Sequence, residues 1–210
     1  MFSTTQARAS TRRSRSAVIS LAVGVAIMGA AVVGLLGDQQ SAAYVSAPPE
    51  APALPPRDAG PGADGSVPAG VTVFDDDIPA VANLDADLLA ALRQAATVAA
   101  DDGITFVVTS GWRSAEYQDQ LLGDAVAEYG SAAEAARWVA TPDTSPHVQG
   151  AAIDVGPWAA MDWLSQHGTA FGLCQVYANE PWHYELRPDA VDGGCPTLYA
   201  DPTHDPRMHP

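Results

Sequence analysis

The sequence predicts an α+β domain in which helices pack on a small, mainly antiparallel sheet. Patterns with helical spacing come first along the chain, and short runs rich in β-branched and aromatic residues gather late. Residues 71–198 form one stretch without a visible internal repeat, which is long enough for a single core. Hydrophobic residues make up 47% of the chain and charged residues 17%, which is compatible with a globular protein.

The first helix is expected directly after Asn83, a residue type that caps helices. Apolar residues between 84 and 99 recur at helical spacing, and Gly103 ends this pattern. Residues 104–109 are a short run that contains β-branched side chains, which predicts a strand.

A second helix is expected to begin after Ser114 as its cap and to end at Gly130. Residues 131–134 read Ser-Ala-Ala-Glu, a capping box that opens a third helix, and Trp138 on that helix is expected in the core. The rest of the domain is expected to hold a loop over 141–146, strands over 151–155, 173–177 and 182–186, and a helix over 157–166.

Residues 17–36 form an uncharged apolar run, which predicts a transmembrane anchor or a signal sequence. About 20 apolar residues span a bilayer as a helix. The arginines before the run place residues 1–16 in the cytoplasm and the rest of the chain outside it. The small residues at 41–43 suit signal cleavage, so a secreted form stays open beside a single-pass membrane form.

Residues 37–70 are expected to be a linker, because seven prolines and three glycines fall between positions 46 and 68. The folded domain is expected over 71–198. Residues 199–210 are expected to form a flexible, proline-rich tail, in which His204 and His209 are poor candidates for metal ligands.

The charge of the chain argues against a nucleic-acid partner. After Ala43 there are six arginines and 24 acidic residues, a net charge of −18, and such a surface repels phosphate backbones. Cys174 and Cys195 are the only cysteines, and both follow the apolar run. An oxidising compartment outside the cytoplasm is expected to join them in a disulfide.

Two histidines and one aspartate are the candidate metal ligands. His147 lies in the expected loop before a strand that holds Asp154, and His183 lies in another expected strand. Imidazole nitrogen and carboxylate oxygen both suit zinc, and three protein ligands leave one position for water. Taken alone, the spacing of these residues is weak evidence, and the sequence around them is what favours a site.

Three blocks carry a resemblance to a known family. They read Ser-Gly-Trp-Arg-Ser-Ala-Glu-Tyr-Gln at 110–118, Ser-Pro-His-Val-Gln-Gly-Ala-Ala-Ile-Asp at 145–154 and Glu-Pro-Trp-His-Tyr-Glu at 180–185. In this order they resemble the D-alanyl-D-alanine carboxypeptidases of the VanY type, within the LAS-type zinc metallopeptidase superfamily. The resemblance covers residues 80–195 and implies a hedgehog/D-Ala-D-Ala peptidase-like fold with one zinc ion in a cleft.

The resemblance also implies a role for each matching residue. It assigns zinc to His147, Asp154 and His183, and the role of general base to Glu180. It places Arg113 against the substrate or the transition-state oxyanion. It places Ser114, Gln118 and Ser145 in the same substrate pocket. Trp112 stands where tyrosine is common in the family.

The identity of the base is a choice between two glutamates. Side chains alternate along a strand, so Glu185 shares a face with His183 and is the choice that spacing alone favours. Glu180 precedes Pro181, which keeps it out of helical geometry and permits a bend toward the metal. We follow the resemblance and expect Glu180 as the base, with Glu185 exposed or behind the ligands.

The expected function is that of a membrane-anchored, monomeric zinc carboxypeptidase. Its expected substrate is the terminal D-Ala-D-Ala bond of peptidoglycan stem peptides, outside the cytoplasm of a bacterial cell. Two alternatives stay open: an endopeptidase of the same superfamily that cuts inside the stem peptide, and a non-catalytic wall-binding domain that retains zinc.

Overall fold

A computed structural model of the protein describes residues 62–209. The expected cytoplasmic segment at 1–16, the expected anchor or signal at 17–36 and most of the expected linker lie outside the described residues. Among residues 62–209, no helix is both long enough and apolar enough to cross a bilayer.

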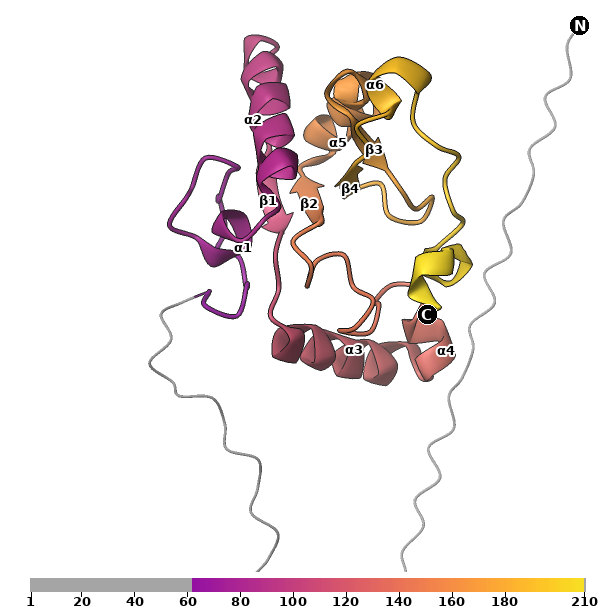
Figure 1. The fold of residues 1–210 in the computed structure, drawn as a ribbon. Coiled ribbons are helices and arrows are strands. Elements are labelled where there is room, and N and C mark those ends of the chain that lie inside the picture. Colours follow the sequence, from indigo (N-terminus) through magenta and orange to yellow (C-terminus); the bar gives the residue numbers. More distant parts are fainter. Residues whose placement is uncertain (1–61, 210) are drawn as a thin grey trace, which may run out of the picture. The chain divides into compact units, whose positions relative to one another are not determined.

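Four short strands form an antiparallel sheet in the spatial order β1-β2-β4-β3 (Figure 1). They are β1 (Val107–Ser110), β2 (Ala152–Gly156), β3 (Leu173–Gln175) and β4 (His183–Leu186). The central strands β2 and β4 are paired so that Asp154 lies opposite His183. The expected α+β class with an antiparallel sheet is confirmed.

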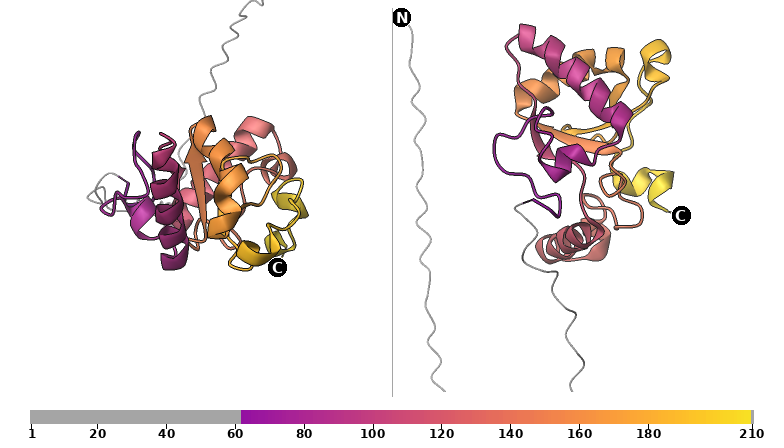
Figure 2. Two further views of the ribbon diagram at one scale, coloured as in Figure 1. Left: turned by 90° about the horizontal axis from the view of Figure 1, so that it is seen from above. Right: turned by 60° about the vertical axis from the view of Figure 1, so that its left-hand side comes forward.

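Helices precede the sheet strands, alternate with them and follow them, and α2 and α5 pack on one face of the sheet (Figure 2). The α-helices of the described residues are α1 (Pro79–Ala82), α2 (Ala86–Asp101), α3 (Ala115–Tyr129), α4 (Ala132–Ala135), α5 (Trp158–His167) and α6 (Ala190–Gly193). Three short 3-10 helices are η1 (Gly168–Phe171), η2 (Pro202–His204) and η3 (Pro206–Met208).

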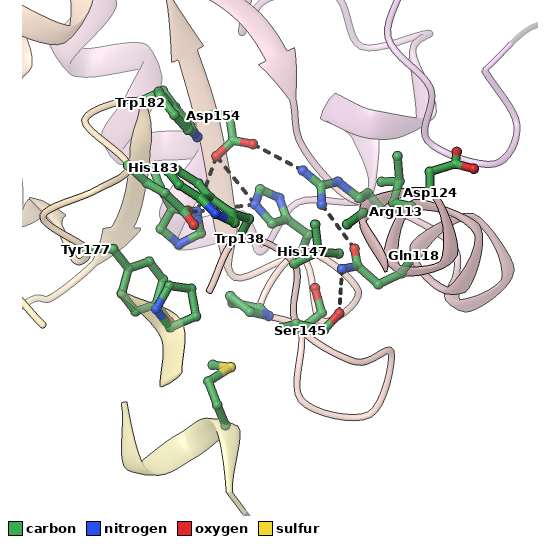
Figure 3. Close-up of a pocket in the computed structure, with 18 of the residues that line it drawn as sticks. Arg113, Gln118, Asp124, Trp138, Ser145, His147, Asp154, Tyr177, Trp182 and His183 are labelled. Carbon is green, nitrogen blue, oxygen red and sulfur yellow. Dashed lines mark hydrogen bonds and ion pairs between the residues drawn. The ribbon is translucent and has the colours of Figure 1, made fainter. Parts of the chain in front are cut away.

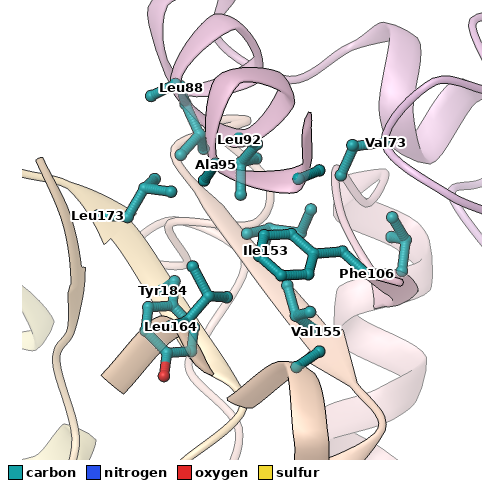
Figure 4. Packing of buried hydrophobic residues seen from close by; sticks show 14 of the residues in the cluster. Val73, Leu88, Leu92, Ala95, Phe106, Ile153, Val155, Leu164, Leu173 and Tyr184 are labelled. Atoms are coloured by element: carbon teal, nitrogen blue, oxygen red, sulfur yellow. The ribbon is translucent and has the colours of Figure 1, made fainter. Parts of the chain in front are cut away.

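The two faces of the sheet have different chemistry because side chains alternate along each strand. Ile153, Val155 and Tyr184 point into the apolar core that α2 and α5 cover (Figure 4). Asp154 and His183 alternate with these residues and therefore point to the opposite face. The fold buries its apolar residues on one side of β2 and β4 and presents its polar residues on the other.

Helix α2 differs from the sequence prediction at its start. Asn83 ends the short helix α1, and Asp85 caps α2 by accepting hydrogen bonds from the backbone N–H groups of Asp87 and Leu88. At the other end, the N–H of Ile104 donates to a carbonyl of the last turn of α2. Residue 104 therefore belongs to the end of the helix, and β1 begins at Val107, where its pairing with Gly156 of β2 starts.

Helices α3 and α4 have the predicted caps. Ser114 accepts a hydrogen bond from the N–H of Tyr117 at the start of α3, and Gly130 ends this helix in the left-handed conformation. Ser131 caps α4, as the capping box predicts, although α4 is only a single turn. The predicted disulfide between Cys174 and Cys195 is also present, and it ties β3 to the chain after α6.

The C-terminal segment, residues 199–209, corrects the expectation of a flexible tail. It forms η2 and η3, and the side chains of Asp201 and Asp205 cap these turns in buried positions. Its proline-rich composition is that of a loop, but its polar groups bond to residues more than 20 positions away. Long-range bonds of this kind leave no local signal in a sequence.

The folded part also begins earlier than position 71. The carbonyl of Asp64 accepts a hydrogen bond from the N–H of Ser114, and Val67 packs against the core. Residues 62–70, expected as linker, are therefore part of the packed domain.

Candidate metal centre

His147, Asp154 and His183 form a buried cluster in which one donor atom of each lies within 4.8 Å of the others. Figure 3 shows the two imidazoles and the carboxylate pointing toward one another. His147 comes from the loop before β2, and the other two residues face each other across the β2–β4 pair. The structure thus brings together the three residues that the sequence predicts as ligands.

The loop geometry that holds His147 depends on two glycines. His147 Nδ1 lies 2.8 Å from the carbonyl oxygen of Gly111, so its Nε2 faces the cluster, 3.4 Å from Asp154 Oδ1. A Cβ at Gly111 would collide with the carbonyl oxygen of Ala80. Gly150 turns the chain after the histidine with a φ of +69°, a conformation that side chains disfavour.

His183 and Asp154 are also held by hydrogen bonds on the atoms that point away from the cluster. His183 Nδ1 lies 3.2 Å from Asp154 Oδ1, and its Nε2 lies 3.3 Å from Glu185 Oε1 on the far side. Asp154 Oδ2 accepts a hydrogen bond of 3.1 Å from Arg113 Nη2. For all three residues, the atom away from the cluster already has a partner, which leaves the near atoms directed at a common point.

The electrostatics of the cluster keep Asp154 ionised and His147 neutral. Burial raises the pKa of Asp154, but the charges and hydrogen bonds of His147 and His183 outweigh it and hold that pKa well below its usual range. Burial lowers the pKa of His147, which keeps this imidazole neutral and able to donate a lone pair. Burial opposes the charged form of His183, yet the hydrogen bonds that it donates to Asp154 and Glu185 raise its pKa to about 9. A metal ion at Nδ1 would displace a proton from this imidazole.

Glu180 lies beside this cluster and Glu185 behind it. Glu180 Oε2 is 3.8 Å from His183 Nδ1, and its buried Oε1 has no hydrogen-bond partner among the described residues. Burial raises the pKa of Glu180 to about 7. Glu185 is fully buried and pairs with Arg187 and Arg207. Of the two glutamates, only Glu180 lines the cleft described below.

The guanidinium of Arg113 is held in place by hydrogen bonds to three neighbouring side chains. Its Nε donates to Ser110 Oγ at 2.7 Å, and its Nη1 donates to Gln118 Oε1 at 3.1 Å. Its Nη2 reaches Asp154, as described above. Gln118 in turn donates to the carbonyl of Ala140. Gln118 therefore aligns Arg113, and each terminal nitrogen of the guanidinium retains a second N–H.

The two serines expected in the pocket have different positions. Ser114 was expected in the substrate pocket; it caps α3 and is not among the residues that line the cleft. Ser145 lines the cleft, and its buried Oγ has no hydrogen-bond partner among the described residues. A buried hydroxyl of this kind requires a partner, which a ligand in the cleft can supply.

A cleft of about 420 Å³ opens over the cluster. Its wall includes residues that sequence reasoning missed or misplaced, among them Asp124, Tyr129, Trp138, Tyr177, Trp182 and Met208. Trp138 was expected in the core, but it is 37% exposed and stacks on Tyr129 at the cleft. Trp182 lies inside the third sequence block, which is a signal that could have placed it here.

Two imidazoles and a carboxylate below an open cleft, with a further unpaired carboxylate beside them, are typical of a metal-dependent hydrolase site. Residues 81–189 match the family model VanY, D-alanyl-D-alanine carboxypeptidase. This match covers more than half of the chain, and the chain therefore belongs to the VanY D-alanyl-D-alanine carboxypeptidase family.

Individual relatives are similar over the same part of the chain. A D-alanyl-D-alanine carboxypeptidase of Enterococcus faecalis is 33% identical in a match that covers 40% of this chain and 40% of the relative. This chain therefore spans two fifths of the length of that curated relative.

Solved structures with a related sequence include VanYB in complex with D-alanine-D-alanine. It is 28% identical, with a TM-score of 0.49, and the match covers 53% of this chain and 74% of that one. A D,D-pentapeptidase VanY from a VanB-type vancomycin resistance cassette, in complex with Zn(II), has the same identity and TM-score over 53% and 80% of the two chains. The L,D-carboxypeptidase DacB of Streptococcus pneumoniae is 26% identical, with a TM-score of 0.45 over 53% and 71%.

Proposed function

We propose that this protein is a zinc-dependent carboxypeptidase that hydrolyses the terminal D-Ala-D-Ala bond of peptidoglycan stem peptides. The observation that carries the proposal is the buried cluster of His147, Asp154 and His183 under an open cleft, with Glu180 beside it. Membership of the VanY family supports the choice of reaction. The relative from Enterococcus faecalis is also named a D-alanyl-D-alanine carboxypeptidase.

The donor set fits one zinc ion, because two imidazole nitrogens and a carboxylate oxygen suit this metal. His147 would hold it through Nε2, His183 through Nδ1 and Asp154 through Oδ1, since these atoms face one another. A zinc ion in such a site supplies Lewis-acid polarisation of a carbonyl and activation of water. The bonds on the opposite atoms keep the three side chains in place for this task.

Glu180 would serve as the general base and then as the general acid. Its carboxylate would take a proton from the attacking water and pass it to the leaving amine of the terminal D-alanine. Burial raises its pKa to about 7, close to the value at which a group both accepts and releases a proton near neutral pH. Its Oε2 lies 3.8 Å from His183 Nδ1, on the side of the cluster where this exchange would take place.

Arg113 and Ser145 would bind the end of the peptide. Each terminal nitrogen of Arg113 retains a second N–H, and Arg113 is the one arginine among the residues that line the cleft. Ser145 would donate from its unpartnered Oγ. The recognised group would be the terminal carboxylate or the developing oxyanion, and Gln118 would act by holding Arg113.

The location of the domain follows from the same proposal. A stem peptide is a substrate outside the cytoplasm, and the Cys174–Cys195 disulfide is typical of an oxidising compartment. Residues 17–36 would anchor the chain as a single pass or direct its secretion. The peptidase domain would act as a monomer over residues 71–198, together with the packed segments on both sides of this range.

The test is incubation of the full chain with zinc and a muropeptide pentapeptide, followed by mass spectrometry. Loss of one alanine supports the carboxypeptidase, and a larger cut identifies the endopeptidase instead. An unchanged substrate, with zinc bound, identifies a wall-binding module. The matched control is the Glu180→Gln variant, which keeps the shape of the site and lacks the base.

A further inference from the structure

The C-terminal segment places Arg207 behind the candidate metal centre, on the side away from the cleft, where it contacts Glu185. Arg207 donates from Nη1 to Glu185 Oε2 at 2.7 Å and from Nη2 to Glu185 Oε1 at 3.1 Å. The same guanidinium donates from Nε to Asp205 Oδ2 at 2.9 Å and from Nη2 to that oxygen at 2.5 Å. Both carboxylates are almost fully buried, with 1% and 0% of their residue surface exposed.

Glu185 connects this arginine to the cluster. Its Oε1, which Arg207 holds, also lies 3.3 Å from His183 Nε2. Its Oε2 accepts a second charged contact, from Arg187 Nη2 at 2.8 Å. Because β4 places residues 183 and 185 on the same face, the carboxylate lies directly behind the imidazole. His183 is thus flanked by Asp154 on one nitrogen and by Glu185 on the other.

We propose that Arg207 is a positioning residue of the metal site and that it acts through Glu185 on His183. The inference rests on the proposed function in one respect, that His183 binds the metal. A carboxylate behind a ligand histidine accepts the N–H of the far nitrogen and so leaves the lone pair of the near nitrogen for the metal. The two parallel bonds from Arg207 fix the plane of that carboxylate.

This role is distinct from simple attachment of the C-terminal segment. A second tether exists, because Arg137 Nε donates to Asp201 Oδ2 at 3.0 Å without any contact to Glu185. Arg137 does not line the cleft. It therefore provides a matched control: its loss weakens the hold on the segment and leaves the contacts of Glu185 intact.

The experiment measures zinc affinity in the full chain, by competition with a chromogenic chelator after the metal has been removed. Arg207→Met should weaken zinc binding about 10- to 100-fold, the effect typical of losing a group behind a metal ligand. Arg137→Met should stay within about threefold of the parent protein, because Arg137 bonds to Asp201 and Glu134 and touches neither Glu185 nor the cluster. Equal affinity of Arg207→Met and the parent would overturn the inference.

Two further variants separate positioning from charge neutralisation. Arg207→Lys keeps the positive charge and loses the fork, so it should bind zinc nearly as weakly as Arg207→Met. Full recovery by lysine would show that only the charge matters, which also overturns the inference. In a Glu185→Gln background, Arg207→Met should cause little additional loss, because its effect passes through Glu185.

A spectroscopic measurement covers the case in which Arg207→Met is less stable. Cobalt(II) bound in place of zinc reports ligand geometry through its visible absorption, which is read on folded protein at low temperature. The spectrum should change in Arg207→Met and stay unchanged in Arg137→Met. An unchanged spectrum in both variants contradicts positioning. His183→Ala tests the proposed function separately: if it binds zinc like the parent, the ligand set itself is wrong.

Discussion

At the scale of single residues, the three donors share a feature that prepares them for a cation. His147 is held by a backbone carbonyl, Asp154 by the guanidinium of Arg113 and His183 by the carboxylate of Glu185. Each of these bonds uses the atom that points away from the cluster. The side chains need little reorganisation to bind a metal, which is the usual effect of groups behind metal ligands.

The two glutamates near His183 should respond differently to the same substitution. Glu180→Gln should keep zinc bound and lower kcat at least about 10²-fold, because the general base is lost. Glu185→Gln should act mainly through weaker zinc binding, so that excess zinc restores most of its kcat. Steady-state kinetics at two zinc concentrations checks both statements. The reverse pattern would make Glu185 the base.

The raised pKa of Glu180 predicts that the metal-free protein loses folding stability as the pH rises. Between the usual carboxyl pKa and about 7, the folded state keeps a proton that the unfolded state has released, so stability falls as pH rises through this window. Gln does not titrate. With metal chelated, Glu180→Gln should therefore be more stable than the parent at pH 8, by up to about 3 kcal/mol, and similar to it at pH 4.5.

Urea unfolding at the two pH values measures this difference. Glu185→Gln is the matched contrast, because hydrogen bonds from His183 and Arg207 outweigh its burial and hold the pKa of Glu185 below its usual range. A lowered pKa stabilises the fold above the usual carboxyl pKa, so this variant should lose stability at pH 8. If Glu180→Gln raised the free energy of unfolding equally at both pH values, ionisation of Glu180 would not be the cause.

Arg113 predicts selectivity for a free peptide carboxylate. Its planar fork suits a carboxylate, and a lysine at this position supplies only a point charge. Amidation of the substrate terminus should therefore lower kcat/KM by roughly 2–5 kcal/mol in equivalent free energy. Arg113→Lys should remove most of this preference. The measurement is the kcat/KM ratio for free-acid and amide peptides, and a ratio near one would assign Arg113 to another role.

At the scale of elements, the helix ends that carry capping residues could be predicted from the sequence, whereas the strand ends, which depend on pairing, could be predicted only approximately. Both ends of α3 were predicted, because Ser114 and Gly130 carry their own capping chemistry. The start of α2 was misplaced by a few residues, because Asn83 and Asp85 are both good caps and only the structure distinguishes them. The strand ends were approximate, since they depend on partners elsewhere in the chain.

A substitution at Ser114 tests whether this residue stabilises helix α3 or binds the substrate. Ser114→Ala should lower the free energy of unfolding by about 1 kcal/mol, because the N–H of Tyr117 loses its acceptor. The KM for the peptide should stay unchanged, since Ser114 does not line the cleft. Ser131→Ala, at the cap of α4, is the control. A large rise in KM for Ser114→Ala alone would return this residue to the substrate pocket.

At the scale of the whole domain, the site is built from segments that are distant in the sequence. The cluster of His147, Asp154 and His183 and the position of Glu180 beside it could be predicted, because each residue lies in a recognisable block. The Arg207–Glu185 contact could not, because it joins positions 22 residues apart, and a proline-rich segment resembles an unstructured tail. The same holds for Asp205, which accepts a hydrogen bond from the hydroxyl of Tyr177.

Because the three donors come from a loop and two strands, zinc should stabilise the whole domain. A ligand that binds only the folded state adds about 2.7 kcal/mol at a free concentration one hundred times its Kd. Chelated protein should therefore unfold at lower urea than zinc-loaded protein, by an amount that grows with free zinc. Glu180→Gln should keep this zinc effect, because Glu180 is not a proposed ligand, and His183→Ala should lose nearly all of it. If His183→Ala gained as much stability from zinc as the parent, the metal would be bound elsewhere in the chain.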